Sequence, residues 1–104
     1  MSTTIRELEP KEVWNRFADI NAVPRPSKKE QKITAFMVDF GKKLGLETTS
    51  DAYGNVIIRK PATAGLEQKK PIILQSHLDM VCQKNNDTVF DFDNQGIETY
   101  IDGD

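Results

Sequence analysis

The sequence of 104 residues has few cysteines and no long apolar run. Cys82 is its single cysteine and cannot form a disulfide within the chain, which favours a reducing compartment. No apolar run approaches the ~20 residues that a membrane-spanning helix needs. The first ten residues carry acidic side chains and no apolar stretch, so they do not resemble a signal peptide. These absences predict a cytoplasmic protein without a membrane partner.

A strong charge of either sign is also missing. The 14 Lys and Arg residues nearly balance the 16 Asp and Glu residues, which leaves a formal net charge of -2. Proteins that bind nucleic acid or anionic membranes usually present an excess of positive charge, so the composition predicts neither partner. A hydrophobic content of 38% is typical of an ordinary soluble globular domain. At this length such a domain buries only a modest core.

The first half of the chain predicts two amphipathic helices. Apolar residues recur at helical spacing over residues 10–21, and again behind Ser27 and Glu30 as far as Leu44. Ser27 and Glu30 have the spacing of a capping box, in which the Ser27 hydroxyl accepts a hydrogen bond from the Glu30 amide. Gly45 is a natural C-terminal stop. The aromatic residues on these faces are expected in the core: Trp14, Phe17, Phe36 and Phe40.

The second half changes to short extended runs. Residues 46–50 and 56–59 predict a β-hairpin joined by a loop of about five residues. Residues 71–74 form a continuous apolar run, which is typical of a strand buried on both faces. Residues 96–101 alternate weakly and predict the start of a further strand. The fold class is therefore α/β, with two N-terminal helices packed on a small mixed β-sheet.

His77 and Asp79 directly follow the predicted strand at residues 71–74. In open α/β sheets, ligands and catalytic groups gather beyond the carboxyl ends of the strands. Zinc takes neutral imidazole as a ligand, and a carboxylate commonly fixes the tautomer of that imidazole. Residues two apart in extended chain share a face. The pattern predicts a metal ligand with its support, although a His-x-Asp tripeptide also occurs by chance and is compatible with a structural role.

Other candidate ligands in this region have weaker support. Asp87, Asp91 and Asp93 lie nearby in the sequence, but their spacing forms no metal site. Cys82 lies close behind His77, yet a lone cysteine is more often a small buried residue than a ligand. The metal prediction therefore depends on His77 and Asp79.

The chain also resembles a known family over nearly its whole length. Residues 72–81 (IILQSHLDMV) resemble the first metal-binding motif of the M20 family of zinc peptidases. Other segments resemble one branch of that family, the aminoacyl-histidine dipeptidases (peptidase D, cytosol non-specific dipeptidase): residues 54–55, 59–65, 83–88 and 91–92, and the early turn with Ser27 and Glu30. Because several unrelated segments agree in order and spacing, the resemblance is specific.

The resemblance implies a zinc-dependent dipeptidase that hydrolyses dipeptides, including Xaa-His, through a water bridged between two zinc ions. Other divalent metals are compatible with it. His77 matches a histidine ligand of one ion, and Asp79 matches the catalytic-site aspartate that supports it. The family's remaining ligands, its general base and its lid domain come later than the point where this sequence stops. We therefore expect residues 1–104 to be the N-terminal part of the catalytic domain, inactive alone, and the complete enzyme to be a homodimer.

Two alternatives stay open at this stage. The chain could be a shortened, non-catalytic relative that acts as a small folding or interaction module. It could also be a metal-binding domain with a mononuclear site unlike the family's. A coding sequence that continues beyond residue 104 with an Asp-containing glycine loop and a Glu-Glu pair favours the dipeptidase. A stop codon there favours the module, and tight stoichiometric zinc binding by the chain alone favours the mononuclear site.

Overall fold

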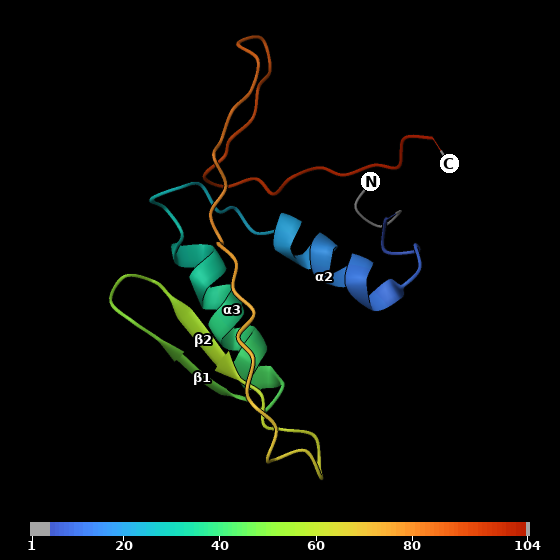
Figure 1. Cartoon of the computed structure of the whole chain (residues 1–104). Coiled ribbons are helices and arrows are strands. Elements are labelled where there is room, and N and C mark those ends of the chain that lie inside the picture. Colours follow the sequence, from blue (N-terminus) through green and yellow to red (C-terminus); the bar gives the residue numbers. More distant parts are fainter. Residues whose placement is uncertain (1–4, 104) are drawn as a thin grey trace.

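The computed structural model describes residues 5–103, in which two helices precede a β-hairpin (Figure 1). The elements are α2 (Lys11–Asn21), α3 (Gln31–Lys43), β1 (Glu47–Ser50) and β2 (Val56–Arg59). The strands pair antiparallel, with Glu47 opposite Arg59 and Ser50 opposite Val56. The predicted α/β class is confirmed, but the sheet found in residues 5–103 is two-stranded and antiparallel rather than mixed. No helix in this described part is long and apolar enough to cross a membrane.

Helix α3 packs against the hairpin and contacts both of its strands (Figure 1). Its Ile33 side chain is fully buried. Gly41 lies directly against the hairpin: a Cβ atom there would overlap Thr48 Oγ1 and lie 3.1 Å from Ile58 Cγ1. The missing side chain at Gly41 therefore allows the helix and the hairpin to approach each other.

Replacing Gly41 with alanine is expected to destabilise the fold by about 1–3 kcal/mol, the usual cost of overpacking. Alanine has a helix propensity about 1 kcal/mol better than that of glycine, so any net loss of stability reports the steric overlap with the hairpin. Urea unfolding followed by circular dichroism measures the change. The matched control is Lys42→Ala, at an exposed position of the same helix turn. An unfolding midpoint for Gly41→Ala equal to or above that of the wild type would contradict this packing.

The start of α3 differs from the prediction, whereas its end agrees. Glu30 is the N-cap residue, and no side chain caps the helix. The Glu30 carboxylate accepts a hydrogen bond from the Lys28 amide (2.7 Å), and the Ser27 hydroxyl donates to Asp79. The predicted capping box is wrong because Lys28 has a positive φ of 70°, which turns the chain between Ser27 and the helix. Gly45, with φ of 73°, is confirmed as the stop.

The predicted aromatic core is only partly formed. Trp14, Phe36 and Phe40 are half-buried, but Phe17 is 48% exposed, so the core prediction is wrong for Phe17. The Phe36 and Phe40 rings stack with their centroids 6.4 Å apart. The Arg16 guanidinium of α2 lies 5.5 Å from the Phe40 centroid, a cation–π distance. Part of the contact between α2 and α3 is therefore a cation–π interaction.

Beyond residue 70 the described chain forms no strand, which corrects two predictions. Residues 71–74 and 96–101 are both irregular, and Ile72, Ile73 and Leu74 are 84, 90 and 91% exposed. A strand needs a neighbour for its backbone hydrogen bonds, and no described residue bonds to the backbone of residues 71–74. One isolated parallel bridge, between Pro26 and Met80, joins this half to the loop before α3.

The chain returns to the end of α2 close to its own C-terminus. The Ile97 amide donates to the Asn21 carbonyl (2.7 Å). A Cβ atom on Gly96 would lie 2.7 Å from the Ala22 carbonyl oxygen, closer than real Cβ atoms come to backbone. Glycine at this position therefore permits the segment to cross the helix end.

The molecule exposes more surface than a folded protein of its mass normally does. Its radius of gyration is 16.5 Å, against about 13 Å for a compact domain of this length. Its accessible surface is 8745 Å², against about 5,900 Å² for a folded monomer of 11.8 kDa. Every residue in 59–77 is exposed, and this stretch extends beyond the hairpin, turns at residues 63–69 and then runs back (Figure 1). Much of the chain's apolar surface is thus uncovered.

Candidate metal-binding site around His77

The His77 ring is held by Asp79. Its Nδ1 atom lies 2.9 Å from the Asp79 carbonyl oxygen and 3.0 Å from Asp79 Oδ1. Both oxygens can only accept hydrogen bonds, so this geometry favours the tautomer of the neutral ring with the proton on Nδ1 and the lone pair on Nε2. The His77 side chain is 81% exposed and that of Asp79 is 34% exposed. The pair therefore presents an oriented imidazole nitrogen to its surroundings.

Asp79 is in turn held by Ser27. The Ser27 hydroxyl donates to Asp79 Oδ2 at 2.5 Å, while Oδ1 faces the His77 ring. The pKa of Asp79 lies below its ordinary value, chiefly because of the Ser27 hydroxyl and then because of His77, although desolvation opposes the shift. The carboxylate is therefore ionised at neutral pH and acts only as an acceptor. These hydrogen bonds contribute fully to the stability of the fold when the pH is above the ordinary pKa of an aspartate. Their contribution is lost as the pH falls through the lowered pKa of Asp79 in the folded chain.

Backbone hydrogen bonds fix the segment that carries Asp79. The Met80 amide donates to the Arg25 carbonyl (2.8 Å), and the Ser27 amide donates to the Met80 carbonyl (3.1 Å). Arg25 Nη1 also donates to the Leu78 carbonyl (3.3 Å). Residues 78–80 are accordingly half-buried, whereas residues 59–77 before them are exposed. The loop before α3 thus clamps the end of the His-x-Asp motif.

The pair fits one metal ligand and its support, and it does not make a complete site. A neutral imidazole with Nδ1–H bound to a carboxylate is the arrangement that metal-ligating histidines adopt. A catalytic zinc takes three protein ligands. Within residues 5–103, no three His, Cys, Asp or Glu side chains lie together so that they could hold a metal ion. The metal role of His77 and the supporting role of Asp79 therefore stay predictions.

The nearby carboxylates take part in local structure. Asp91 accepts hydrogen bonds from the Asp93 amide (3.0 Å) and from Asn94 Nδ2 (2.8 Å). The pKa of Asp91 is lowered, mainly by the Asn94 side chain. Asp93 forms an ion pair with Lys29 (3.1 Å). These groups order the turn at residues 91–95 and connect it to the loop before α3.

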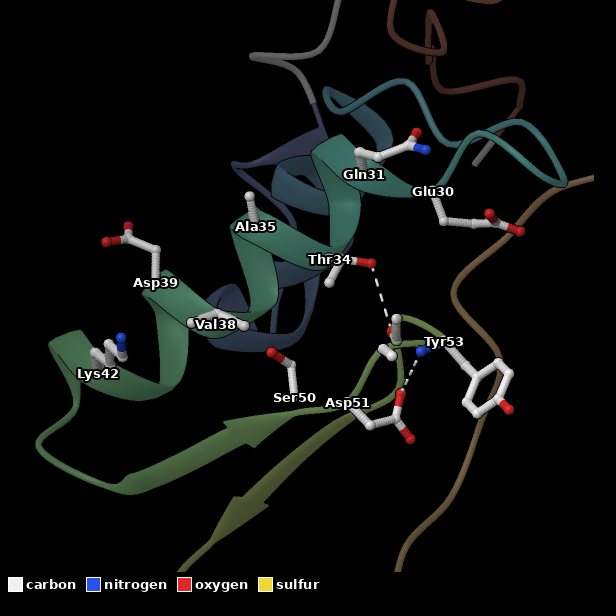
Figure 2. Close-up of a pocket in the computed structure, with 12 residues that line it drawn as sticks. Glu30, Gln31, Thr34, Ala35, Val38, Asp39, Lys42, Ser50, Asp51 and Tyr53 are labelled. Carbon is white, nitrogen blue, oxygen red and sulfur yellow. Dashed lines mark hydrogen bonds between the residues drawn. The ribbon is translucent and has the colours of Figure 1, made fainter.

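A separate open groove lies between α3 and the turn of the hairpin (Figure 2). Asp51 accepts a hydrogen bond from the Tyr53 amide (2.9 Å), and Thr34 Oγ1 lies 3.5 Å from the Gly54 carbonyl oxygen. The pKa of Asp51 is lowered, first by the Asn55 side chain. His77 is not among the residues that line this groove. The groove is therefore a feature of the helix–hairpin junction, distinct from the candidate metal site.

The sequence prediction brings His77 and Asp79 together correctly, but it misses the contribution of Ser27. The capping-box pattern assigned the Ser27 hydroxyl to the start of α3. In the structure this hydroxyl donates to Asp79, which lies 52 residues further along the chain. Arg25 is missed as well. Only the pairing of Arg25 and Ser27 with residues 78–80 places these groups at the site.

Comparison with known proteins supports the resemblance. No family model matches the sequence. The cytosol non-specific dipeptidase of Escherichia coli (strain K12) is 48% identical over 99 residues, which make up 95% of this chain and 20% of that protein. The crystal structure of aminoacylhistidine dipeptidase from Vibrio alginolyticus matches with a TM-score of 0.90 and 43% identity, over 99% of this chain and 22% of that one.

These similarities confirm the predicted resemblance to the aminoacyl-histidine dipeptidases. The chain spans about one fifth of the length of these relatives. Because the structural match covers 99% of the chain, it includes the exposed path of residues 71–74 and the His77–Asp79 motif. In the Vibrio protein a similar path belongs to a chain more than four times longer.

Proposed function

We propose that residues 1–104 are the N-terminal part of the catalytic domain of an M20-type, zinc-dependent dipeptidase that acts on dipeptides, including Xaa-His, in the cytoplasm. The observation that carries the proposal is the His77 ring oriented by Asp79, in a chain 48% identical to a cytosol non-specific dipeptidase. The complete protein, meaning the product that continues beyond residue 104, then supplies the other ligands, the general base and a lid domain. It assembles as a homodimer.

In this proposal His77 binds one of two zinc ions through Nε2. Asp79 accepts the Nδ1 proton, which orients the ring and raises the basicity of Nε2. Bound zinc supplies Lewis-acid chemistry, which polarises a peptide carbonyl and lowers the pKa of water towards neutrality. The 81% exposure of the His77 side chain leaves room for ligands from the remainder of the protein.

The uncovered surface supports the view that these residues are one part of a larger domain. The excess over a folded monomer of this mass is about 2,800 Å², similar to the area buried in an obligate interface. Residues 72–74 are all exposed, and in a strand their side chains would alternate between the two faces. Flanking strands and a layer on each face would cover them, as in the interior of an α/β sheet. We assign this cover to later parts of the same chain.

The alternatives explain fewer of the contacts. A binding module does not require the arrangement around His77, in which Ser27 holds the Asp79 carboxylate and that carboxylate orients an exposed imidazole. A mononuclear site within this chain needs a ligand cluster, and the side chains of residues 5–103 form none. The dipeptidase proposal accounts for the contacts around His77 and for the uncovered surface.

The proposal is tested by assaying the complete protein on a panel of dipeptides that includes Xaa-His. We expect hydrolysis, complete loss of it after treatment with a strong chelator, and recovery when zinc is returned, because zinc activates the attacking water. Release of free amino acids, followed by chromatography, measures turnover. Hydrolysis that persists in the fully metal-free protein would contradict a metallopeptidase, and absence of hydrolysis under all conditions would favour the non-catalytic module.

A further inference from the structure

We propose that Ser27 is a positioning residue of the candidate metal site, acting through Asp79 on the His77 ring; this inference rests on the proposed function. The two oxygens of one carboxylate are divided between two partners. Oδ2 accepts from the Ser27 hydroxyl at 2.5 Å, and Oδ1 lies 3.0 Å from His77 Nδ1. With both oxygens engaged, the carboxylate cannot turn about its bond without losing one partner. Ser27 thereby keeps Oδ1 directed at the ring.

The hydroxyl has no task at the start of α3. Helix α3 starts at Gln31 with Glu30 as its N-cap and without a side-chain cap. The Glu30 carboxylate binds the Lys28 amide, so Ser27 takes no part in a capping box. A second acceptor of the hydroxyl, the Met80 carbonyl, is 3.3 Å away and belongs to the same short segment as Asp79. Both acceptors of the Ser27 hydroxyl thus lie at the candidate site.

The backbone keeps Ser27 beside Asp79 without help from the hydroxyl. The Ser27 amide donates to the Met80 carbonyl (3.1 Å), and the Met80 amide donates to the Arg25 carbonyl (2.8 Å). Arg25 Nη1 adds a third connection, to the Leu78 carbonyl (3.3 Å). Removal of the Ser27 hydroxyl therefore leaves these three hydrogen bonds in place and frees the Asp79 carboxylate. This separation makes a positioning role distinguishable from a structural one.

The first test uses the 104-residue chain, in which His77 is the single histidine. Long-range ¹⁵N–¹H spectra of the neutral ring report which ring nitrogen carries the proton. We expect Nδ1–H to predominate in the wild type. In Ser27→Ala the Asp79 carbonyl oxygen, 2.9 Å from Nδ1, remains as an acceptor while Oδ1 is released, so Nε2–H should gain population in part. Ser27→Thr, which keeps a hydroxyl, should restore the wild-type spectrum. Ser50→Ala, the same change at an exposed position of β1, is the matched control.

The second test measures zinc affinity in the complete protein by competition with a chromophoric chelator. Loss of an outer hydrogen-bonding partner of a metal ligand typically weakens binding 10–100-fold, so about tenfold is expected for Ser27→Ala. Ser27→Thr and Ser50→Ala should stay close to the wild-type value.

The outcomes separate the two proposals. A changed tautomer with weaker zinc binding supports both. A changed tautomer with unchanged zinc affinity keeps the positioning role and contradicts His77 as a ligand, and with it the proposed function. An unchanged tautomer overturns the positioning role. If the Met80 amide loses its hydrogen-exchange protection in Ser27→Ala, the hydroxyl maintains the clamp itself, and the positioning role is also overturned.

Discussion

Replacing His77 with alanine in the complete protein should lower kcat/KM for dipeptides by more than roughly 100-fold. Removal of an outer partner of a metal ligand already costs 10–100-fold, and loss of the ligand itself removes a direct bond to the metal. The effect should fall on kcat at saturating substrate, because zinc stabilises charge that develops in the transition state. Steady-state kinetics with a Xaa-His dipeptide measure both constants.

Two further variants give this prediction its controls. Gln68→Ala removes a polar side chain of similar size from the exposed connection before residue 71, and it should leave the kinetics unchanged. Asp79→Asn keeps the shape of the side chain but removes the negative charge that faces Nδ1, and it should give an intermediate loss. If His77→Ala showed wild-type kinetics, His77 would not be part of the catalytic site.

The 104-residue chain alone should hydrolyse no dipeptide, even with zinc in excess. Residues 5–103 contain no cluster of ligands for a metal ion, and a catalytic zinc needs three protein ligands. The relevant measurement compares the release of amino acids by the chain and by the complete protein at equal molar concentration. The chain should give no rate above that of buffer containing zinc. Zinc-dependent turnover by the pure chain would show that the site is self-contained.

The elements predicted correctly are those that depend on neighbours close in the sequence. The helical periodicity that ends at Leu44 and Gly45 identifies α3, because the side chains of one helix face recur every three or four residues. The hairpin is equally local: β1 and β2 pair across one turn in the register Thr49 to Ile57. Local patterning was therefore sufficient for both elements.

The strand predicted at residues 71–74 depends on partners that the described chain does not contain. An apolar run indicates how strongly a segment favours burial, but a strand forms only when another strand accepts and donates its backbone hydrogen bonds. Here the backbone of residues 71–74 bonds to no described residue, and the side chains stay exposed. The prediction of a buried strand is therefore wrong for the described chain, because composition alone does not supply the neighbouring strand.

The candidate site was half predictable for a similar reason. His77 and Asp79 are two residues apart, so extended geometry alone brings them together. Ser27 and Asp79 are 52 residues apart, and the local capping-box pattern predicted a different partner for the Ser27 hydroxyl. The positive φ of Lys28, which decided between the two roles, has no clear signal in a lysine.

The central claim is that His77 of this chain binds a metal ion in a dipeptidase centre that later residues complete. Native mass spectrometry of the zinc-loaded complete protein tests it most directly, by counting bound zinc in the wild type and in His77→Ala. The account predicts two zinc ions per subunit in the wild type and the loss of one of them in the variant, together with the loss of turnover. Two tightly bound ions and full turnover in His77→Ala would contradict it.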